Sequence, residues 1–296
     1  MNAGPSVTLI VLTYNQERFV AEALESALDQ SYHPLEILVA DDASTDATIT
    51  IAEQILARYT GRHSVRLIKN ERNLGVTGHL VASAKVARGE IVVVAAGDDI
   101  SNADRVEKIV PLFDDLDVWS TTSGFDLVDH DGKVIAADQP VALGVMRSKK
   151  GSQLFIRDDG LVVIQGSTAA YRKELFLVDM PPGRLDFAED NFLNALVYAY
   201  GKKVHNIPYS LVRYRQHRNS LSNSPSSPRA SDPDAIARAE RHVRRLRALL
   251  WVASKAPRGD VLATTSIRLA LLKFKLICKF PKIRHLKKIP QFLNLA

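Results

Sequence analysis

The sequence of 296 residues predicts an α/β protein with a mostly parallel central sheet, flanking helices and a C-terminal helical appendage. Three observations support this prediction. Short apolar runs alternate with longer segments over roughly the first hundred residues, as in βαβ units. The apolar runs are nearly uninterrupted, which is typical of strands buried on both faces. A segment rich in Ser and Pro, residues 220–233, separates this part from the appendage.

Seven elements alternate in the first third of the chain. The predicted strands are short runs of five to seven residues, which suits a buried strand better than a helix. The strands are residues 7–13, 35–40, 65–69 and 91–95, and the helices are residues 17–30, 47–59 and 76–87. This series predicts a largely parallel sheet that is covered by helices.

The alternation is less regular after residue 99. We expect a helix at 104–113, strands at 118–128 and 133–136, a helix at 189–201 and a strand at 204–208. Residues 220–233 form a predicted linker, and residues 235–253 form an Arg-rich helix. The expected domains are therefore residues 1–222, which carry the site, and residues 223–296, the linker with a basic helical appendage.

Two of the apolar runs end in acidic pairs. Residues 35–46 read LEILVADDASTD, and residues 90–99 read EIVVVAAGDD. A solvated turn or a helix cap would explain either pair alone. Together they favour a functional site, because the carboxyl ends of parallel strands bind ligands and clustered carboxylates repel one another unless a cation or a hydrogen-bond donor lies between them.

Several classes of protein are excluded by the sequence. The turn after the first strand, residues 13–17, has no glycine, which argues against a Rossmann dinucleotide site and a P-loop. The single cysteine, Cys278, excludes an internal disulfide and a zinc ribbon. Without a signal peptide or a run of about 18 apolar residues, we expect a cytoplasmic protein that has no membrane span.

Positive charge is concentrated at the C-terminal end. The net charge of the chain is +6, but residues 261–296 contain eight Lys or Arg and no Asp or Glu, so residues 1–260 carry −2. Within this tail, residues 267–280 mix apolar and cationic side chains, as an interfacial helix does. An anionic membrane surface is one expected partner, at the inner face of the cell membrane. The alternative is a helix packed on the body with its Lys side chains exposed.

At the level of motifs, the chain resembles the inverting family 2 glycosyltransferases over roughly residues 7–222. The resemblance lies in the order and spacing of several segments rather than in one motif. These are LIVLTYN at 9–15, ALDQ at 27–30, EILVADDASTD at 36–46, NLG at 73–75, ARGE at 87–90 and GDD at 97–99. The resemblance implies the A-type glycosyltransferase fold with a Rossmann-like nucleotide-binding half, a nucleotide-diphosphate-sugar donor and a divalent metal, Mg²⁺ or Mn²⁺.

The same resemblance assigns the nucleotide site. Asp42 corresponds to the carboxylate that accepts hydrogen bonds from the base, and Thr13 and Asn15 line the same pocket. Arg72 and Asn73 border the base.

The second acidic pair, Asp98 and Asp99, matches the family's metal motif, and Asp98 is also expected to bind the nucleotide. At Ala96 many members of the family carry an Asp that touches the ribose, so the ribose contacts stay unassigned here and Asp98 is the preferred metal ligand. Independently of the family, a sugar diphosphate needs its developing negative charge neutralised, which a bound Mg²⁺ or Mn²⁺ achieves.

The general base is expected at Asp190. Residues 187–193 open a predicted helix and resemble the family's Glu-Asp motif, in which the Asp takes the acceptor proton. Glu189 is expected to shape the pocket. The alternative is that both acids simply favour a helix N-terminus.

Two further segments resemble pocket-forming parts of the family. Residues 165–172, with Gly166 and Ser167, resemble the segment that shapes the acceptor and sugar pocket. Residues 214–222, with Arg215, His217 and Ser220, resemble the loop that closes over the diphosphate, where His217 could also ligate the metal. A mobile surface loop is the alternative interpretation.

These observations predict a metal-dependent inverting glycosyltransferase that moves a sugar from a nucleotide-diphosphate donor, UDP-sugar favoured, to a hydroxyl of a glycan or lipid-linked acceptor. Bacterial surface polysaccharide synthesis is the expected setting, by analogy. A sugar-phosphate nucleotidyltransferase is the alternative enzyme, but its glycine-rich basic loop is absent. A non-catalytic nucleotide-sugar-binding or nucleic-acid-binding protein is a second alternative; the net acidic body and a tail without aromatic interleaving argue against nucleic acid.

Overall fold

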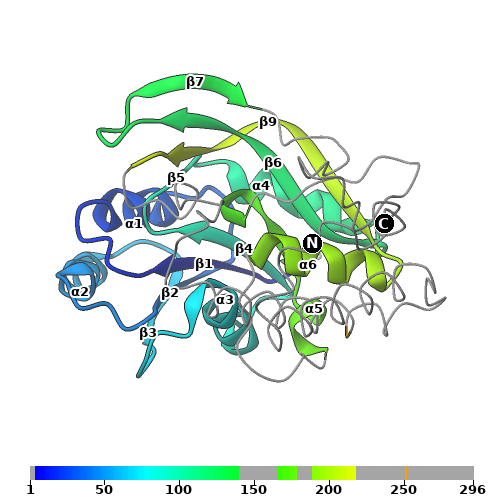
Figure 1. The fold of residues 1–296 in the computed structure, drawn as a ribbon, viewed down its shortest axis with the longest axis horizontal. Coiled ribbons are helices and arrows are strands. Elements are labelled where there is room, and N and C mark those ends of the chain that lie inside the picture. Colours follow the sequence, from blue (N-terminus) through cyan, green and yellow to red (C-terminus); the bar gives the residue numbers. More distant parts are fainter. Residues whose placement is uncertain (1–3, 140–165, 179–188, 218–250, 252–296) are drawn as a thin grey trace, which may run out of the picture.

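The computed structural model describes residues 4–139, 166–178, 189–217 and 251 of the chain (Figure 1). Their strands form one curved sheet in the order β3-β2-β1-β4-β8-β6-β9-β5, with β7 paired to β6. Helices cover both faces of the part built from β1 to β4 (Figure 1). The α/β prediction is therefore confirmed, with a sheet that is mixed rather than wholly parallel.

The parallel half of the sheet matches the sequence prediction. It consists of β1 (Val7–Thr13), β2 (Leu35–Asp41), β3 (Ser64–Lys69) and β4 (Ile91–Ala96). β1 pairs in parallel with β2 and with β4, and β2 pairs in parallel with β3. Every residue of β2 is buried, as a strand covered on both faces requires.

Side chains of these strands divide between two cores, because successive residues of a strand point to opposite faces. One core joins Leu9, Ile37 and Val93 to α1 (Val20–Leu28), α2 (Thr48–Arg58) and α4 (Arg105–Ile109). The other joins Ile10, Leu38 and Val92 to α3 (Gly75–Val86), α5 (Glu174–Leu177) and α6 (Glu189–Ala199). The apolar runs of the sequence thus supply both faces of the sheet.

The second half of the sheet is mixed. β8 (Ala170–Arg172) is antiparallel to β4 and to β6 (Val118–Val128), and β7 (Val134–Gln139) is antiparallel to β6. β9 (Lys203–Arg215) runs parallel to β6 and antiparallel to β5 (Ile100–Ser101). β9 is much longer than the predicted strand 204–208, and it extends past Pro208 to the edge of the site.

The predicted helix at 104–113 is split into two parts. α4 ends at Ile109, and a 3₁₀ turn, η1, covers Val110–Asp114. Pro111 lacks the N–H that an α-helix would need at this point, so the helix cannot continue unchanged. α4 nevertheless buries Val106 and Ile109 in the first core, which keeps its N-terminus fixed against the sheet.

The predicted linker 220–233 lies outside the described residues, as does most of the predicted helix 235–253. Trp251 is described: it is helical and partly buried, and it packs against the second core. Within the described part of the chain, no helix combines the length and the apolar character that crossing a bilayer requires.

Candidate functional site

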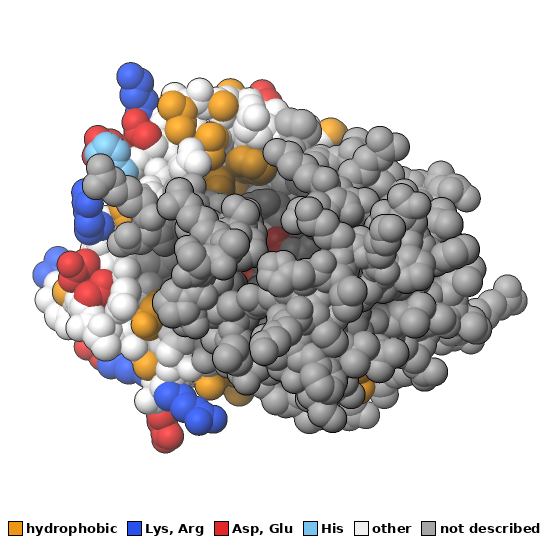
Figure 2. Space-filling model, in the orientation of Figure 1, with side chains coloured by type: hydrophobic (Ala, Val, Ile, Leu, Met, Phe, Trp, Pro, Cys, Tyr) orange, Lys and Arg blue, Asp and Glu red, His pale blue; other side chains and the backbone are white. Residues whose placement is uncertain are grey.

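The residues that follow β1, β2 and β4 meet at one edge of the sheet. Thr13 ends β1, Asp41 ends β2 and is followed by Asp42, and the pair Asp98 and Asp99 lies just after β4. Because the three strands are parallel neighbours, their carboxyl ends lie together. On the face drawn in Figure 2, acidic atoms are visible near the centre, below a group of hydrophobic side chains.

Asp42 is buried and holds the start of α3. Its Oδ1 accepts hydrogen bonds from Asn70 Nδ2 and the Leu74 amide, both at 2.8 Å, and its Oδ2 accepts one from the Gly75 amide at 3.0 Å. The His79 ring lies behind it, with Nδ1 3.9 Å from Asp42 Oδ1. Since a carboxylate offers about four acceptor positions, these three donors leave about one for a ligand.

His79 is buried between Asn70 and the backbone of β2. Its Nε2 lies 3.0 Å from the Ala40 carbonyl and its Nδ1 2.9 Å from Asn70 Nδ2. Burial lowers the pKa of His79, although the nearby Asp42 carboxylate acts in the opposite direction. The neutral ring therefore serves as a fixed support for the Asp42 pocket.

Thr13 and Asn15 join the turn after β1 to the loop after β2. Thr13 Oγ1 donates to Asp41 Oδ1 at 2.9 Å, and Asn15 Oδ1 accepts from the Thr45 amide at 2.8 Å. Asn15 has a φ of 52°, a left-handed conformation that Asn tolerates better than most residues. Both side chains thus fix the loops of the expected nucleotide pocket.

Arg72 and Asn73 lie on the exposed turn that leads into α3. Asn73 Oδ1 accepts from the Gly75 amide at 3.0 Å, the same amide that donates to Asp42. The structure therefore brings these two residues to the rim of the Asp42 pocket.

Asp98 and His217 form a close pair at the same edge. Asp98 Oδ2 lies 3.0 Å from His217 Nε2, and their side chains are 17% and 12% exposed, so solvent reaches both. The His217 ring packs against Phe19, with centroids 4.6 Å apart and planes inclined by 35°. Two potential metal ligands thus lie side by side, and Phe19 supports the ring of one of them.

Asp99 points inward. Its Oδ1 accepts from the Arg215 amide at 2.8 Å, whereas its buried Oδ2 has no hydrogen-bond partner among the described residues. Burial and the neighbouring Asp98 carboxylate raise the pKa of Asp99 to about 8, while the Arg215 amide, the Ser167 hydroxyl and Arg105 act in the opposite direction. The Ser167 hydroxyl lies near Asp99 but outside hydrogen-bond geometry.

Arg215 is buried next to Asp98 and Asp99 and has several protein partners. Its guanidinium forms an ion pair with Glu22 and donates to the Asp98 carbonyl at 2.9 Å and the His130 carbonyl at 2.8 Å. The guanidinium carbon also lies 5.0 Å from the centroid of the Phe19 ring. This arrangement favours a role in holding the Asp98 backbone and the Phe19 side chain over direct contact with a diphosphate.

Glu189 and Asp190 open α6, and both are partly buried. Burial, together with Asp190, raises the pKa of Glu189 to about 7. Gly166 makes room for the Glu189 carboxylate, because a Cβ at position 166 would overlap Glu189 Oε1. The hydroxyl of Tyr171 is buried and has no hydrogen-bond partner in the described part of the chain, and burial, Glu189 and Asp190 all raise its pKa.

The turn η2 (Gly166–Thr168) lies between the Asp98–Asp99 pair and the Glu189–Asp190 pair. Gly166 touches Glu189, and Ser167 lies next to Asp99. The structure therefore brings together the expected metal pair, the expected base pair and the expected sugar-pocket segment. Ser220 lies outside the described residues.

A divalent cation fits the kind of donors found here. Mg²⁺ and Mn²⁺ are commonly bound by one or two protein side chains, with phosphate oxygens completing the shell, and Asp98 and His217 would serve as such ligands. Among the described residues, no group of three or more His, Cys, Asp or Glu side chains is arranged to hold a metal. A cation at this place would therefore take its other ligands from a diphosphate and from water.

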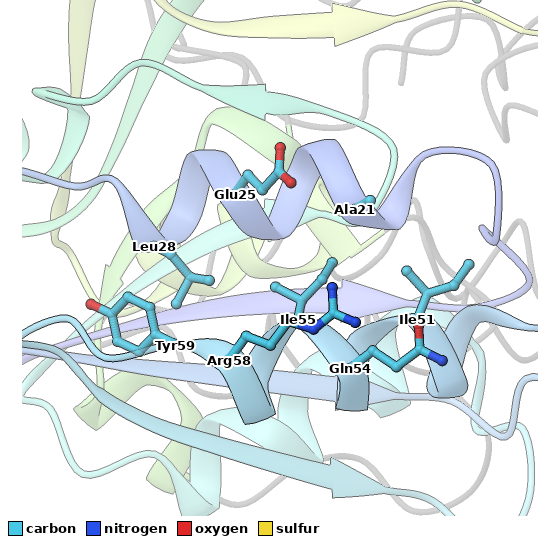
Figure 3. Close-up of a pocket in the computed structure, with 8 residues that line it drawn as sticks. All are labelled: Ala21, Glu25, Leu28, Ile51, Gln54, Ile55, Arg58 and Tyr59. Atoms are coloured by element: carbon cyan, nitrogen blue, oxygen red, sulfur yellow. The ribbon is translucent and has the colours of Figure 1, made fainter.

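A separate groove of about 380 Å³ lies between α1 and α2 (Figure 3). Leu28 of α1 faces α2, and Ile51 and Ile55 of α2 point toward α1 (Figure 3). None of the residues that line this groove belongs to the acidic pairs.

Sequence reasoning missed several residues of the site. Arg105 and His79 are buried polar side chains on helices, and the motifs considered above do not include them. Tyr171 lies on β8, a strand of three residues that is too short to show a period. Phe19 lies just before α1 and Glu22 lies within it. Their roles come from contacts with distant residues, Phe19 with His217 and Glu22 with Arg215.

The chain is similar to several known proteins. The family model "Glycosyl transferase family 2" matches residues 8–177. A protein of Bacillus subtilis (strain 168) named as a glycosyltransferase, EpsE, is 43% identical over 110 residues, 37% of this chain and 39% of EpsE. The succinoglycan biosynthesis protein ExoO of Rhizobium meliloti (strain 1021) is 33% identical over 129 residues, 44% of this chain and 36% of ExoO. The matched region thus spans well under half of either relative.

Solved structures share the fold. The crystal structure of S. aureus TarS 1–349 in complex with UDP-GlcNAc has a TM-score of 0.60 at 18% identity, over 97% of this chain and 77% of that one. The mannosyltransferase PcManGT from Pyrobaculum calidifontis, in complex with GDP-Man and Mn²⁺, has a TM-score of 0.55 at 20% identity, over 100% and 79%. With the family model matching more than half of its length, the chain belongs to glycosyl transferase family 2.

Proposed function

We propose that the protein is an inverting glycosyltransferase that moves a sugar from a nucleotide-diphosphate donor to a hydroxyl group. The observation that carries this proposal is the convergence of the Asp42 pocket, the Asp98–His217 pair and the Glu189–Asp190 pair around one sheet edge and the turn η2. Donor binding, neutralisation of the diphosphate charge and removal of the acceptor proton would each have a residue at this place. Family membership argues against a sugar-phosphate nucleotidyltransferase.

The donor end of the site uses the residues after β1, β2 and β4. Asp42 would accept a hydrogen bond from the base, within a pocket kept in shape by Asn70 and His79. Asp98 and His217 would hold Mg²⁺ or Mn²⁺, which supplies charge neutralisation for the diphosphate leaving group. The neighbours bound to UDP-GlcNAc and to GDP-Man with Mn²⁺ support this choice of donor and metal.

The reaction itself is a single displacement. The Asp190 carboxylate takes the proton of the acceptor hydroxyl while the hydroxyl oxygen forms a bond to the anomeric carbon. The bond from the anomeric carbon to the diphosphate oxygen breaks, and its electron pair leaves with the diphosphate. Since attack and departure take place on opposite faces, the anomeric configuration inverts.

The acceptor is proposed to be a growing glycan or a lipid-linked glycan. The likeness to ExoO, a succinoglycan biosynthesis protein, supports a role in polysaccharide synthesis. The eight cations of residues 261–296 would favour an anionic membrane surface, where lipid-linked acceptors lie. This peripheral location at the inner face of the membrane is part of the proposal.

A panel of UDP-, GDP- and dTDP-sugars tests the proposal directly. Each is incubated with the full chain and with MnCl₂, MgCl₂ or EDTA, and release of the nucleoside diphosphate is measured. Release from at least one sugar that depends on the metal supports the proposal. Failure of every sugar both to bind and to react would contradict it.

A further inference from the structure

Arg105 is a fully buried cation at the first position of α4. Its Nη1 donates to Ser101 Oγ at 2.9 Å, and its Nη2 donates to the Val94 carbonyl at 2.7 Å and the Ser167 carbonyl at 2.9 Å. Removing a guanidinium from water is costly: burial lowers the pKa of Arg105 to about 10, and the nearby Asp99 carboxyl group acts in the opposite direction. A buried charge with this many directed bonds requires an explanation beyond packing.

The three acceptors of Arg105 come from separate parts of the site. Val94 lies near the end of β4, shortly before the pair Asp98 and Asp99, and Ser101 lies in β5, just after that pair. Ser167 lies in η2, the turn whose Gly166 accommodates Glu189. One guanidinium therefore links the segment that carries the metal pair to the turn that touches the base pair.

We propose that Arg105 is a positioning residue that fixes the Asp98–Asp99 segment at the correct distance from the turn η2, and thereby aligns the donor diphosphate with the Glu189–Asp190 pair. This inference rests on the site assignment under the proposed function and extends it to a side chain that touches neither substrate nor metal. Its basis is geometric, namely the bonds to Ser101, Val94 and Ser167.

The planar guanidinium is required for this role. Its fork of N–H groups reaches two carbonyls and a hydroxyl at once, whereas the ammonium group of Lys is a point charge on a flexible chain. The substitution Arg105→Lys therefore keeps a positive charge at this position and loses the fixed spacing. A misplacement on the order of 1 Å between reacting groups can lower a rate by about 10²-fold.

Arg66 offers a control. Its Nη1 donates to Glu36 Oε1 at 2.7 Å and to the Val86 carbonyl at 3.2 Å, so it also combines a charge with a backbone contact. Arg66 lies in the edge strand β3, which β2 and β1 separate from β4. Arg66→Lys should therefore alter these two contacts without moving the site.

The test compares the full-length wild type with Arg105→Lys and Arg66→Lys, using the nucleotide sugar that the wild type hydrolyses fastest. Arg105→Lys should lower kcat by about 10- to 100-fold while KM for the donor and the affinity for UDP with Mn²⁺ change by less than about threefold. Arg66→Lys should leave kcat and KM within about twofold of the wild type. Equal kcat losses in the two variants, or an unchanged kcat in Arg105→Lys, would overturn the inference.

A second measurement does not depend on activity. The Ala169 amide donates to the Gly166 carbonyl and closes the turn η2. Its hydrogen exchange should be faster in Arg105→Lys than in Arg66→Lys when both are compared at equal global stability. Equal exchange rates in the two variants would contradict the positioning role even if the proposed donor chemistry proved wrong.

If Arg105→Lys does not fold, Ser101→Ala takes its place. This change removes only the hydroxyl that receives Arg105 Nη1, and we expect a several-fold lower kcat with an unchanged KM. An unchanged kcat in Ser101→Ala would then overturn the inference. A wild type that lacks turnover, or whose turnover is insensitive to Asp98→Ala, identifies a failure of the proposed function instead.

Discussion

The Asp98 carboxylate and the His217 imidazole are 119 positions apart in the chain and meet at 3.0 Å. Phe19 supports the imidazole ring, and Arg215 binds the backbone carbonyl of Asp98, so both partners of the pair are held by buried neighbours. Such a pair is suited to binding a cation that a diphosphate brings with it.

The first prediction concerns this pair. Asp98→Asn and His217→Gln keep the size of each side chain but weaken its ability to ligate a metal, so each should reduce the Mn²⁺-dependent part of UDP binding by about tenfold or more. Calorimetric titration of UDP with and without MnCl₂ measures this. Asp117→Asn, at an exposed acid that pairs with Lys202, is the control and should not change binding. Full transfer activity in EDTA would refute the metal assignment.

The second prediction concerns the space at Gly166. Gly166→Ala places a methyl group where Glu189 Oε1 lies, so we expect a loss of stability of about 1–3 kcal/mol and a much lower transfer rate. Gly78→Ala in α3 is the control, because its methyl group would meet only the Leu74 Cβ, at 3.3 Å.

A double variant isolates the cause. If the overlap with Glu189 destabilises Gly166→Ala, the same substitution should cost clearly less stability in a Glu189→Ala background. Urea denaturation of the four proteins in the cycle measures this coupling. Equal costs in both backgrounds would show that Glu189 is not what fills the space beside Gly166.

The third prediction concerns pH. The pKa of Glu189 is raised from 4.5 to about 7 in the folded protein, so between these values the folded state binds more protons than the unfolded state. The contribution of this group to stability is therefore lost as pH rises from about 4.5 to about 7. Glu189→Gln carries no titrating group, so its melting temperature relative to the wild type should rise over this window.

Thermal melts at pH 5 and pH 8 check this prediction. Glu174→Gln, at an exposed acid in the first turn of α5, provides the comparison. A melting-temperature difference between wild type and Glu189→Gln that does not change with pH would show that Glu189 is not a buried, titrating acid.

The fourth prediction concerns the basic tail. Truncation after Ser254 removes the eight cations of residues 261–296 but keeps Trp251, which packs against the second core. We expect release from anionic vesicles, since each cation near such a surface contributes about 1 kcal/mol. Transfer to a short soluble acceptor should survive.

Truncation after residue 250 is the matched control. It also removes Trp251, so it should lower the melting temperature, whereas truncation after Ser254 should not. Vesicle co-sedimentation and thermal melts of the two truncated proteins separate the two effects. Unchanged vesicle binding after truncation at Ser254 would favour a tail that packs on the body with its Lys side chains exposed.

Much of the fold could be predicted because its strongest signals are local. The buried runs of β1, β2 and β4 and the acidic pairs that follow them are contiguous in the sequence, and parallel pairing brings their ends together. β8 and β5 have three and two residues, respectively, and exist only through pairing with distant strands, so no periodicity could reveal them.

The site was predictable in part for the same reason. Asp42, Asp98 and Asp190 lie in motifs, whereas the roles of Arg105 and His79 depend on which distant residues their side chains contact. An Arg at the start of a helix usually lies at the surface, and only the tertiary contacts of Arg105 with Ser167 and Val94 show that it is buried. Arg215, expected at a diphosphate, is instead buried against Glu22 and backbone carbonyls for the same reason.

The transfer rate of Asp190→Asn, together with the stereochemistry of the wild-type product, tests the central claim most directly. The substitution keeps size and shape but removes the proton acceptor, so donor and Mn²⁺ should bind almost as in the wild type while transfer falls by about 10² to 10⁴-fold. NMR of the wild-type product should show an anomeric configuration opposite to that of the donor. Transfer by Asp190→Asn at the wild-type rate, or a product that retains the configuration of the donor, would contradict single displacement with Asp190 as the base.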